Sequence, residues 1–459
     1  MRLINESKIN ESNSKYQIAL DEAERWLKVL SSEKLNEYQR RKVVKDTVDN
    51  FNSYYNKGFL EYRKSMTEAG QYAAVEWDGQ GSIITDIMGR HFIDCLGGYG
   101  IYSAGIKHPK IVDAVSKQLH RMPLSSQELF DPLRGVLAEL LGEIAPGDLQ
   151  YSFFINNGTD AVEGAMKLAR LYTKKPGFIS CLKGFHGKSY GSLSLMGKAE
   201  YRAPFGPLLP EIHFVPFGDA EAVEFELRKA EDVGFGIAAV IAEPVQGEAG
   251  AITPPDNYWP RLREICNRHG VLLIADEVQT GLGRTGRMFA VEHWDVVPDI
   301  MCLGKALGGG VMPLSAFIST PKIWKVLEEN PFIHSSTFGG NPLACAAGIA
   351  AIKVTIEEDL PGQAATSGEF LLKRLKEIQS YYKDYLVAVR GKGLLIGLEF
   401  VDNEFGYSVA AGLFRRGVLV AGTLLNSKVI RIEPALNISR ELLEQVLQLL
   451  EETLKELTC

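Results

Sequence analysis

Three short apolar runs of the chain end in residues that could do chemistry. They are IAAVIAEP (237–244), VLLIAD (271–276) and IMCLG (300–304), and the residues at or just after their ends are Glu243, Asp276 and Lys305. Apolar runs of this length that alternate with helical stretches are typical of a mainly parallel sheet covered by helices on both faces. Because ligands bind beyond the carboxyl ends of such strands, we expect the three side chains to meet at one edge of the sheet.

Lys305 and Asp276 are suited to hold an aldehyde-bearing, protonated ring. A lysine amine forms a Schiff base only when it is neutral, and desolvation at a strand end lowers its pKa. Asp276 would need a cationic partner, because an uncompensated buried charge is costly. A protonated pyridine nitrogen is such a partner, and this ion pair lets the ring of pyridoxal phosphate accept electrons from a carbanion. Taken singly, the lysine is a solvated loop residue and the aspartate a cap, so it is their pairing that favours the cofactor.

A strand, turn and helix in YSFFINNGTDAVEGAMKLARLY (151–172) could hold the phosphate of such a cofactor. The pattern predicts a strand at 151–155, a tight turn and then a helix. Gly158 allows close approach of the backbone, and Thr159 adds a hydroxyl donor. The free amides and the dipole of a helix N-terminus also favour an anion. Thr159 could equally be an N-cap, and the two roles are compatible.

Three glycines form a motif that points to a different cofactor. Gly281, Gly283 and Gly286 have the spacing G-x-G-x-x-G of dinucleotide-binding turns. They come several residues after the predicted strand, and RMFAVEHWDVVPD behind them does not begin a long helix. A nicotinamide-linked dehydrogenase is therefore the weaker alternative. A non-catalytic regulator built on the same cofactor fold would need a DNA-binding domain, for which the mixed-charge N-terminal segment is a poor candidate.

Length and composition set wider limits on the class of protein. The 459 residues suffice for two substantial domains, or for one large domain with flanking pieces. A formal net charge of −7 provides no field that would hold nucleic acid. The six cysteines include no C-x-x-C pair, so we expect buried thiols in a reducing compartment. With no apolar stretch near 18 residues and no signal-peptide core, the expectation is a cytoplasmic protein without membrane contact.

The pattern along the chain predicts four parts. They are a polar helical arm at 1–57, the N-terminal part of a small domain at 58–105, a large cofactor-binding domain at 106–340 and the rest of a small α+β domain at 341–459. The arm is expected to pack on the main body or on a second subunit, with its basic cluster around Arg40 as a solvated helix face. The last part is expected to hold helix to about 377, β-like runs at 394–400, 418–420 and 429–432, and a closing helix from about Arg440.

Seven sequence blocks, in order from about 90 to 440, resemble the class III aminotransferases of the pyridoxal-phosphate fold type I superfamily. The blocks are NGTDAVEGAMKLAR, GFHGKSYGSLS, AVIAEPVQGEAG, LLIADEVQTGLGRTGRMFA, DIMCLGKALGGGVMP, HSSTFGGNPLACAA and VIRIEPAL. The resemblance implies a large, mainly parallel α/β sheet domain, a smaller α+β domain and a helical N-terminal arm. Within the family, GFLEYRKS, AVEW, FIDCLGG, SQELFDPLR, VPFG and VLVAGTL are similar to the bacterial members that act on putrescine.

The resemblance also implies roles in cofactor binding. It assigns the Schiff base and proton transfer to Lys305, the ring nitrogen to Asp276, the ring hydroxyl to Gln279, the ring face to Phe185, the phosphate to Gly158 and Thr159, and the phosphate in the neighbouring subunit to Thr337. The last assignment implies a homodimer. One departure from the family pattern is Asn157, where a serine is more common.

Residues for the substrate follow from the same resemblance. Arg431 matches the arginine that binds a substrate carboxylate, a contact suited to a guanidinium fork. Since a diamine has no carboxylate, we expect Glu248 or Glu243 to neutralise Arg431 when the diamine is bound and to move away for the keto acid. Gln127, with its neighbour Glu128, is a candidate for the diamine pocket, and a cap or a surface position is an equal alternative. His186 is interpreted as a structural neighbour of Phe185, and the eight histidines show no metal-binding spacing.

The implied reaction is the transfer of a terminal amino group from putrescine, or from a related diamine such as cadaverine, to 2-oxoglutarate. Its products would be glutamate and 4-aminobutanal, which cyclises to 1-pyrroline. The alternative within the family is a transaminase that acts on 4-aminobutyrate, ornithine or acetylornithine.

Overall fold

The computed structural model describes residues 2–65 and 74–458. The chain forms two compact units, one of residues 1–78 with 85–90 and the other of residues 79–84 with 91–459. The boundary between these two units does not coincide with the expected boundaries at 57, 105 and 340. The expected division into four parts stays a prediction. All candidate site residues belong to the second unit.

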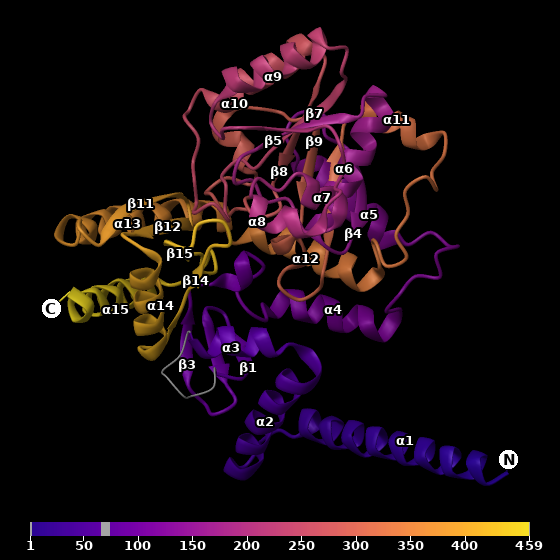
Figure 1. Ribbon diagram of the computed structural model, residues 1–459, viewed down its shortest axis with the longest axis vertical. Coiled ribbons are helices and arrows are strands. Elements are labelled where there is room, and N and C mark those ends of the chain that lie inside the picture. The colour runs from indigo at the N-terminus through magenta and orange to yellow at the C-terminus, as the bar shows by residue number, and fades with distance from the viewer. Residues whose placement is uncertain (1, 66–73, 459) are drawn as a thin grey trace. The chain divides into compact units, whose positions relative to one another are not determined.

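The first unit is mainly helical, as the polar N-terminal pattern predicts (Figure 1). Its helices are α1 (Arg2–Ser31), α2 (Glu37–Asn50), a π-helical turn (Phe51–Tyr55) and α3 (Lys57–Ser65). Helix α2 begins with a capping box, in which Asn36 Oδ1 accepts from the Gln39 amide at 2.9 Å and Gln39 Oε1 accepts from the Asn36 amide at 2.8 Å. Leu35, Val43 and Ile87 form the small buried core of this unit.

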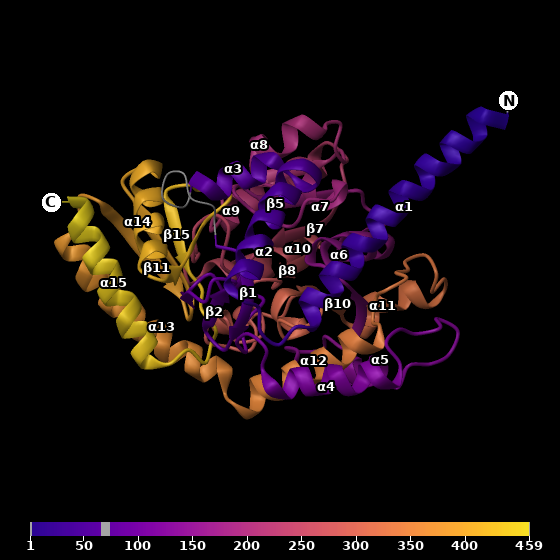
Figure 2. The ribbon, with the colours of Figure 1, turned by 90° about the horizontal axis from the view of Figure 1, so that it is seen from below.

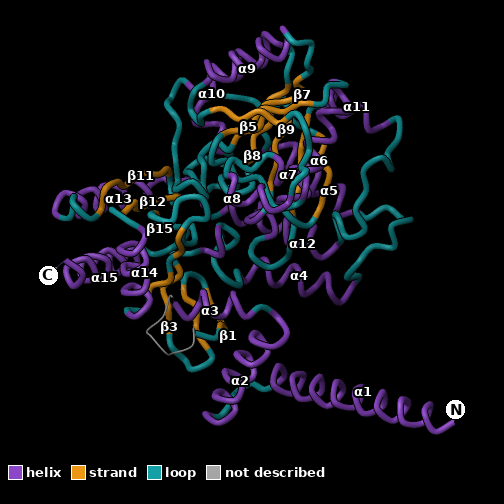
Figure 3. Tube along the Cα trace, viewed as in Figure 1, coloured by secondary structure: helices purple, strands orange, loops and turns teal. Residues whose placement is uncertain are grey.

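A seven-stranded sheet forms the centre of the second unit (Figure 3). In spatial order its strands are β4 (Tyr151–Ile155), β10 (Ser315–Ser319), β9 (Ile300–Leu303), β8 (Leu272–Asp276), β7 (Ile237–Ala242), β5 (Gly177–Cys181) and β6 (Ile212–Val215). Only β10 runs antiparallel to its neighbours within this sheet. The expected α/β fold with a mainly parallel sheet is confirmed, and the strands at 237, 272 and 300 are the three apolar runs.

Successive strand residues point to opposite sides of this sheet, so apolar side chains lie on both faces. Helices cover each face and bury these side chains. In β8, Leu273 and Ala275 join one core and Ile274 joins the other. The first core includes residues of α5 (Pro132–Ile144), α9 (Ala220–Asp232), α10 (Tyr258–His269) and α12 (Pro342–Glu357). The second includes residues of α6 (Gly158–Thr173) and α11 (Pro321–Glu328). Burial on both faces explains why β7, β8 and β9 are apolar without alternation.

The C-terminal part contains a second, antiparallel sheet (Figure 2, orange to yellow). Its strands are β11 (Leu386–Lys392), β12 (Leu395–Phe400), β15 (Val429–Ile432) and β14 (Ala421–Gly422), and its helices are α13 (Leu360–Tyr381), α14 (Asn403–Arg415) and α15 (Arg440–Thr458). The short strand β13 (Val418–Leu419) pairs in parallel with β3 (His91–Asp94). The predicted strands near 394, 418 and 429 and the helix from Arg440 are therefore present.

The remaining elements are short or lie outside the two main sheets. They are β1 (Glu76–Gln80), β2 (Ile83–Asp86), α4 (Pro109–Arg121), α7 (Tyr190–Ser194), α8 (Ala199–Arg202) and 3-10 turns at Gly97–Tyr99, Ala203–Phe205, Ala290–Trp294 and Lys305–Gly308. After β8 the glycine motif runs through turns, with φ of +97° at Gly283 and +94° at Gly286, to the 3-10 turn at Ala290–Trp294. This stretch lacks the helix that a dinucleotide pyrophosphate requires.

The described residues contain no helix that is long and apolar enough to cross a membrane. The five cysteines within the described ranges are buried free thiols.

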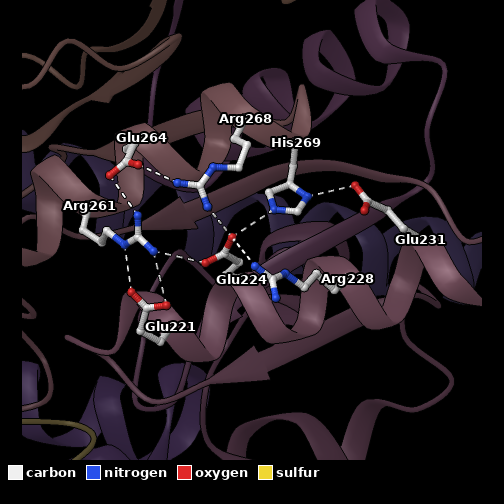
Figure 4. A network of polar contacts seen from close by, with 8 residues as sticks. All are labelled: Glu221, Glu224, Arg228, Glu231, Arg261, Glu264, Arg268 and His269. Carbon is white, nitrogen blue, oxygen red and sulfur yellow. Dashed lines mark hydrogen bonds and ion pairs between the residues drawn. The ribbon is translucent and has the colours of Figure 1, made fainter.

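A charged network links α9 to α10 around one buried carboxylate, Glu224 (Figure 4). Glu224 lies 3.0 Å from Arg228, 3.2 Å from Arg261 and 2.6 Å from Arg268, measured between carboxylate oxygens and guanidinium nitrogens. Burial would raise the pKa of Glu224, but Arg228, His269 and Arg268 outweigh it and lower the pKa to about 2. The network therefore stabilises the fold only while Glu224 is ionised.

We expect Glu224→Gln to lower the midpoint of thermal unfolding at neutral pH, because three arginines would lose their shared anion. A depressed carboxyl pKa adds stability above the unfolded pKa, and that stability is lost as the pH falls toward the folded pKa. The difference in midpoint between Glu224→Gln and wild type should therefore shrink between about pH 5 and pH 3. Glu221→Gln, which changes an exposed carboxylate of the same network, should have a much smaller effect. A pH-independent difference for Glu224→Gln would contradict this account.

Candidate active site

Lys305 lies immediately beyond β9, where Gly304 joins the strand to the 3-10 turn Lys305–Gly308. Its φ is +43°, in the left-handed region that L-residues other than glycine seldom adopt. Strained backbone of this kind collects at functional sites, where the surroundings enforce it. Burial lowers the pKa of Lys305, although the carboxylates of Glu433 and Glu248 oppose that shift. The position therefore favours the neutral amine that the expected chemistry needs.

Asp276 ends β8 and contacts a histidine. Its Oδ2 lies 2.7 Å from His186 Nδ1, and its Oδ1 accepts a hydrogen bond from the Val278 amide at 3.2 Å. Burial would lower the pKa of His186, but the bond to Asp276 and its charge raise it overall. His186 thus orients the carboxylate, and its raised pKa favours the protonated imidazole that would compensate the charge of Asp276. The sequence pattern places His186 beside Phe185 and gives no signal for this contact, which joins residues far apart in the chain.

Gly158 and Thr159 begin helix α6, as the strand-turn-helix pattern predicts. Asn157 is the N-cap, and its Oδ1 accepts from the Asp160 amide at 3.0 Å. Asparagine thus fills a capping role here that a serine could also fill. A methyl group on Gly158 would lie 2.7 Å from Val278, so only glycine fits so closely here.

A cluster of hydroxyl groups surrounds Thr159. Its Oγ1 lies 2.7 Å from Ser189 Oγ and 2.6 Å from Ser192 Oγ. Glu163 accepts hydrogen bonds from the Ser192 amide at 3.0 Å and from the Gly191 amide at 2.8 Å, which fixes the segment that carries the serines. Hydroxyls gathered at a helix N-terminus are suitable donors for a phosphate. The two serines were not singled out from the sequence, although GFHGKSYGSLS contains both.

Gln279 contacts a buried carboxylate that sequence reasoning missed. Its Nε2 donates to Glu433, at 3.0 Å from Oε1 and 3.1 Å from Oε2. Glu433 follows strand β15 directly and is 1% exposed. A side-chain atom added to Gly100 would lie 2.7 Å from Glu433 Oε1, 3.5 Å from Lys305 Cδ and 3.7 Å from Gln279 Cγ. The side chains of Glu433, Lys305 and Gln279 therefore border the same small space next to Gly100.

Arg431 and Glu248 form a buried ion pair with 2.9 Å between Nη2 and Oε1. The other oxygen of Glu248 accepts from the Leu424 amide at 2.9 Å. Burial would lower the pKa of Arg431, but Glu248 and Glu433 outweigh it and raise the pKa. Among the described residues, Nε and Nη1 of Arg431 have no hydrogen-bond partner. The guanidinium therefore retains donors for a further carboxylate.

Glu243, at the end of β7, is held by the main chain. Its Oε1 accepts from the Phe185 amide at 2.9 Å and its Oε2 accepts from the Gly247 amide at 3.1 Å. Burial raises the pKa of Glu243 to about 7. Of the two candidate carboxylates, Glu248 is thus the one placed beside Arg431, while Glu243 fixes the backbone at Phe185.

The structure brings Gln127 and Thr337 together on exposed loops. Gln127 Nε2 donates to the Thr337 carbonyl oxygen at 2.6 Å, and Gln127 has a φ of +71°. Glu128 is exposed beside them. Nearby Arg134 Nε donates to the Gly340 carbonyl at 3.1 Å, so two contacts tie the segment before α5 to the segment before α12.

The chain is similar to known proteins over most of its length. Residues 66–454 match the family model described as Aminotransferase class-III. The chain is 52% identical over 411 residues to a protein of Pectobacterium atrosepticum named putrescine aminotransferase, which covers 89% of this chain and 88% of that protein. Among solved structures, ornithine aminotransferase from Toxoplasma gondii ME49 is 28% identical, with a TM-score of 0.80 over 92% of this chain and 99% of that one. An amine transaminase from an uncultivated Pseudomonas species, solved in its PLP-bound form, is 34% identical, with a TM-score of 0.76 over 84% and 95%.

Proposed function

This chain belongs to the class III aminotransferases, and we propose that it moves a terminal amino group from putrescine, or from a diamine such as cadaverine, to 2-oxoglutarate. The donor would leave as 4-aminobutanal, which cyclises to 1-pyrroline with loss of water, and the acceptor would leave as glutamate. The 52% identity to a putrescine aminotransferase supports the choice of donor. The observation that carries the proposal is the buried Arg431–Glu248 pair beside Lys305, since it suits a substrate with a carboxylate and one without.

The cofactor of this reaction is pyridoxal phosphate, which supplies an aldehyde to receive the amino group and a ring that takes up carbanion electrons. Lys305 would hold the aldehyde covalently, because burial lowers the pKa of its amine and so favours the neutral form. Once the substrate amine has released it, Lys305 would carry the proton between the substrate carbon and the carbon of the cofactor that bears the aldehyde. Asp276, oriented by His186, would hold the ring nitrogen in its protonated form.

Phosphate and ring contacts come from residues around the N-terminus of α6. Gly158 and Thr159 would bind the phosphate through backbone amides and the hydroxyl cluster. Gln279 would donate to the ring hydroxyl. Phe185 would cover one ring face, in a segment that Glu243 fixes through its amide.

Two substrates of opposite character must use one pocket. With a diamine bound, Glu248 would neutralise Arg431, so that a cationic donor meets no unpaired positive charge. For 2-oxoglutarate, Glu248 would move away and Arg431 would bind the carboxylate as a bidentate fork. Gln127 is proposed to line the diamine pocket.

We also propose that the active form is a homodimer in which Thr337 reaches the phosphate of the neighbouring cofactor. Thr337 lies on an exposed loop, and its carbonyl is held by Gln127. Both loops therefore present polar groups outward in a fixed arrangement, as a contribution to a partner subunit requires.

Purified protein incubated with pyridoxal phosphate should absorb visible light and produce glutamate from 2-oxoglutarate and putrescine. Screening putrescine, cadaverine, 4-aminobutyrate, ornithine and acetylornithine would identify the donor class, and a preference for one of the last three would favour the alternative activity. Lys305→Ala should lower turnover by roughly 10²-fold to 10⁴-fold, because a general acid/base is removed. After borohydride reduction, the cofactor should be found on the wild-type peptide that contains Lys305. A label on another peptide would contradict the assignment.

Glu248→Gln should weaken the diamine half-reaction more than the keto-acid half-reaction. Without its anion, Arg431 would repel the cationic donor, and kcat/KM for putrescine should fall roughly tenfold, equivalent to about 1.4 kcal/mol. The KM for 2-oxoglutarate should stay constant or fall. Glu243→Gln is the matched control, because it removes the other candidate carboxylate, which holds the backbone at Phe185, and it should change both half-reactions alike. Equal losses in both half-reactions of Glu248→Gln would contradict the switch.

A hybrid dimer tests the role of Thr337. One subunit carries Lys305→Ala and the other carries Thr337→Ala, with different affinity tags for purification. If Thr337 serves the neighbouring site, the subunit with an intact Lys305 receives an intact Thr337 and should bind pyridoxal phosphate with wild-type affinity. If Thr337 serves its own subunit, the hybrid should show the weaker affinity of the Thr337→Ala homodimer.

A further inference from the structure

Glu433 is a buried carboxylate to which the proposed reaction assigns no role. It follows strand β15 two residues after Arg431, and its amide donates to the Cys95 carbonyl at 2.8 Å. The side chain is 1% exposed, so its charge must be compensated inside the protein. Its place beside Lys305 and Gln279 puts the carboxylate in the candidate active site.

Two cations compensate Glu433 without forming close pairs with it. Arg284 Nε lies 3.9 Å from Oε1, and Arg431 Nη1 lies 3.9 Å from Oε2. Arg284 is itself held in place, since its Nη1 donates to the carbonyls of Leu394 at 3.0 Å and Pro434 at 2.6 Å. Within the described structure, the side-chain hydrogen bonds that Glu433 accepts come from Gln279. The carboxylate is therefore directed at this one amide.

This contact determines which way the Gln279 amide faces. An ionised carboxylate can only accept hydrogen bonds, so the NH₂ end must point toward Glu433. The Oε1 end then points toward Gly247, where an added methyl group would lie 1.8 Å from it. An amide without such a neighbour could adopt either of two nearly equivalent orientations. One N–H suffices for a carboxylate whose two oxygens are nearly equidistant, which leaves the second N–H of Nε2 available.

We propose that Glu433 is a positioning residue that orients the Gln279 amide so that its second N–H is presented to the 3-oxygen of bound pyridoxal phosphate. This inference rests on the proposed cofactor and goes beyond it by assigning the control of Gln279 to a distant strand. The resemblance to the family assigns the ring hydroxyl to Gln279 and gives Glu433 no role. Here the orientation of Gln279 depends on a carboxylate that directly follows strand β15 of the C-terminal sheet.

Glu433→Gln tests the proposal, because it preserves size and removes both the charge and the fixed direction of the hydrogen bond. Affinity for pyridoxal phosphate should fall roughly tenfold, the scale of a lost hydrogen bond to a charged group. The pH midpoint of the visible absorbance of the lysine-bound cofactor should also move to lower pH. The reason is that an anion beside the lysine nitrogen favours the protonated form, while Glu248, Asp276, Arg431, Arg284 and His186 are unchanged.

Two further variants separate orientation from charge and from folding. Glu433→Asp keeps the charge but withdraws it from Gln279, so affinity should fall as in Glu433→Gln, whereas the absorbance midpoint should not move to lower pH. Glu277→Gln is the matched control, since it removes a buried carboxyl on the loop that carries Gln279. Glu277 accepts a hydrogen bond from the Val291 amide at 2.8 Å. Glu277→Gln should leave both the affinity and the midpoint unchanged.

A Gln279→Leu background completes the experiment. If Glu433 acts through Gln279, Glu433→Gln should not weaken cofactor binding further in that background. Fully additive losses, or unchanged binding and absorbance in Glu433→Gln alone, would overturn the proposal. A wild-type protein that shows no cofactor absorbance would instead overturn the proposed function itself.

Discussion

The active site depends on one constraint, that charges at the carboxyl edge of a doubly covered sheet must be compensated by the protein itself. Strands β7, β8 and β9 are buried on both faces, so the residues that end them enter a medium where an unpaired charge is costly. Each carboxylate there has a specific partner. Asp276 has His186, Glu243 has two backbone amides, and Glu248 has Arg431. These partners fix the directions in which the acidic groups can act.

The same constraint connects the seven-stranded sheet to the antiparallel C-terminal sheet. The large sheet supplies Asp276, Glu243 and Lys305, whereas the antiparallel C-terminal sheet supplies Arg431 and, directly after its strand, Glu433. The ion pair between Glu248 and Arg431 and the hydrogen bonds from Gln279 to Glu433 therefore join the loops that follow strands of the large sheet to the C-terminal sheet. Burial keeps these contacts free of competing water, which makes each of them stronger than it would be on the surface.

Much of this arrangement could be predicted from the sequence. The strands that end at Asp276 and before Lys305 follow from apolar runs of fitting length, and the start of α6 at Gly158 follows from a strand, a turn and a glycine. Such features are local, so periodicity and turn chemistry determine them. The contacts that complete the site are not local. His186 is 90 residues from Asp276, and Glu433 is 154 residues from Gln279. Nothing in the neighbourhood of either residue indicates its partner, because the partner is chosen by the tertiary fold.

The two carboxylate oxygens of Glu248 contact different groups. One lies against the buried guanidinium of Arg431, and the other accepts from the main-chain amide of Leu424. A carboxylate tethered at one corner can pivot about that corner, which releases the guanidinium without detaching the side chain from the polypeptide. If Glu248 moves aside for the keto acid as proposed, the amide of Leu424 would be the fixed point of that movement, and the rigidity of the turn around Leu424 would govern how readily the pocket changes between its two substrates.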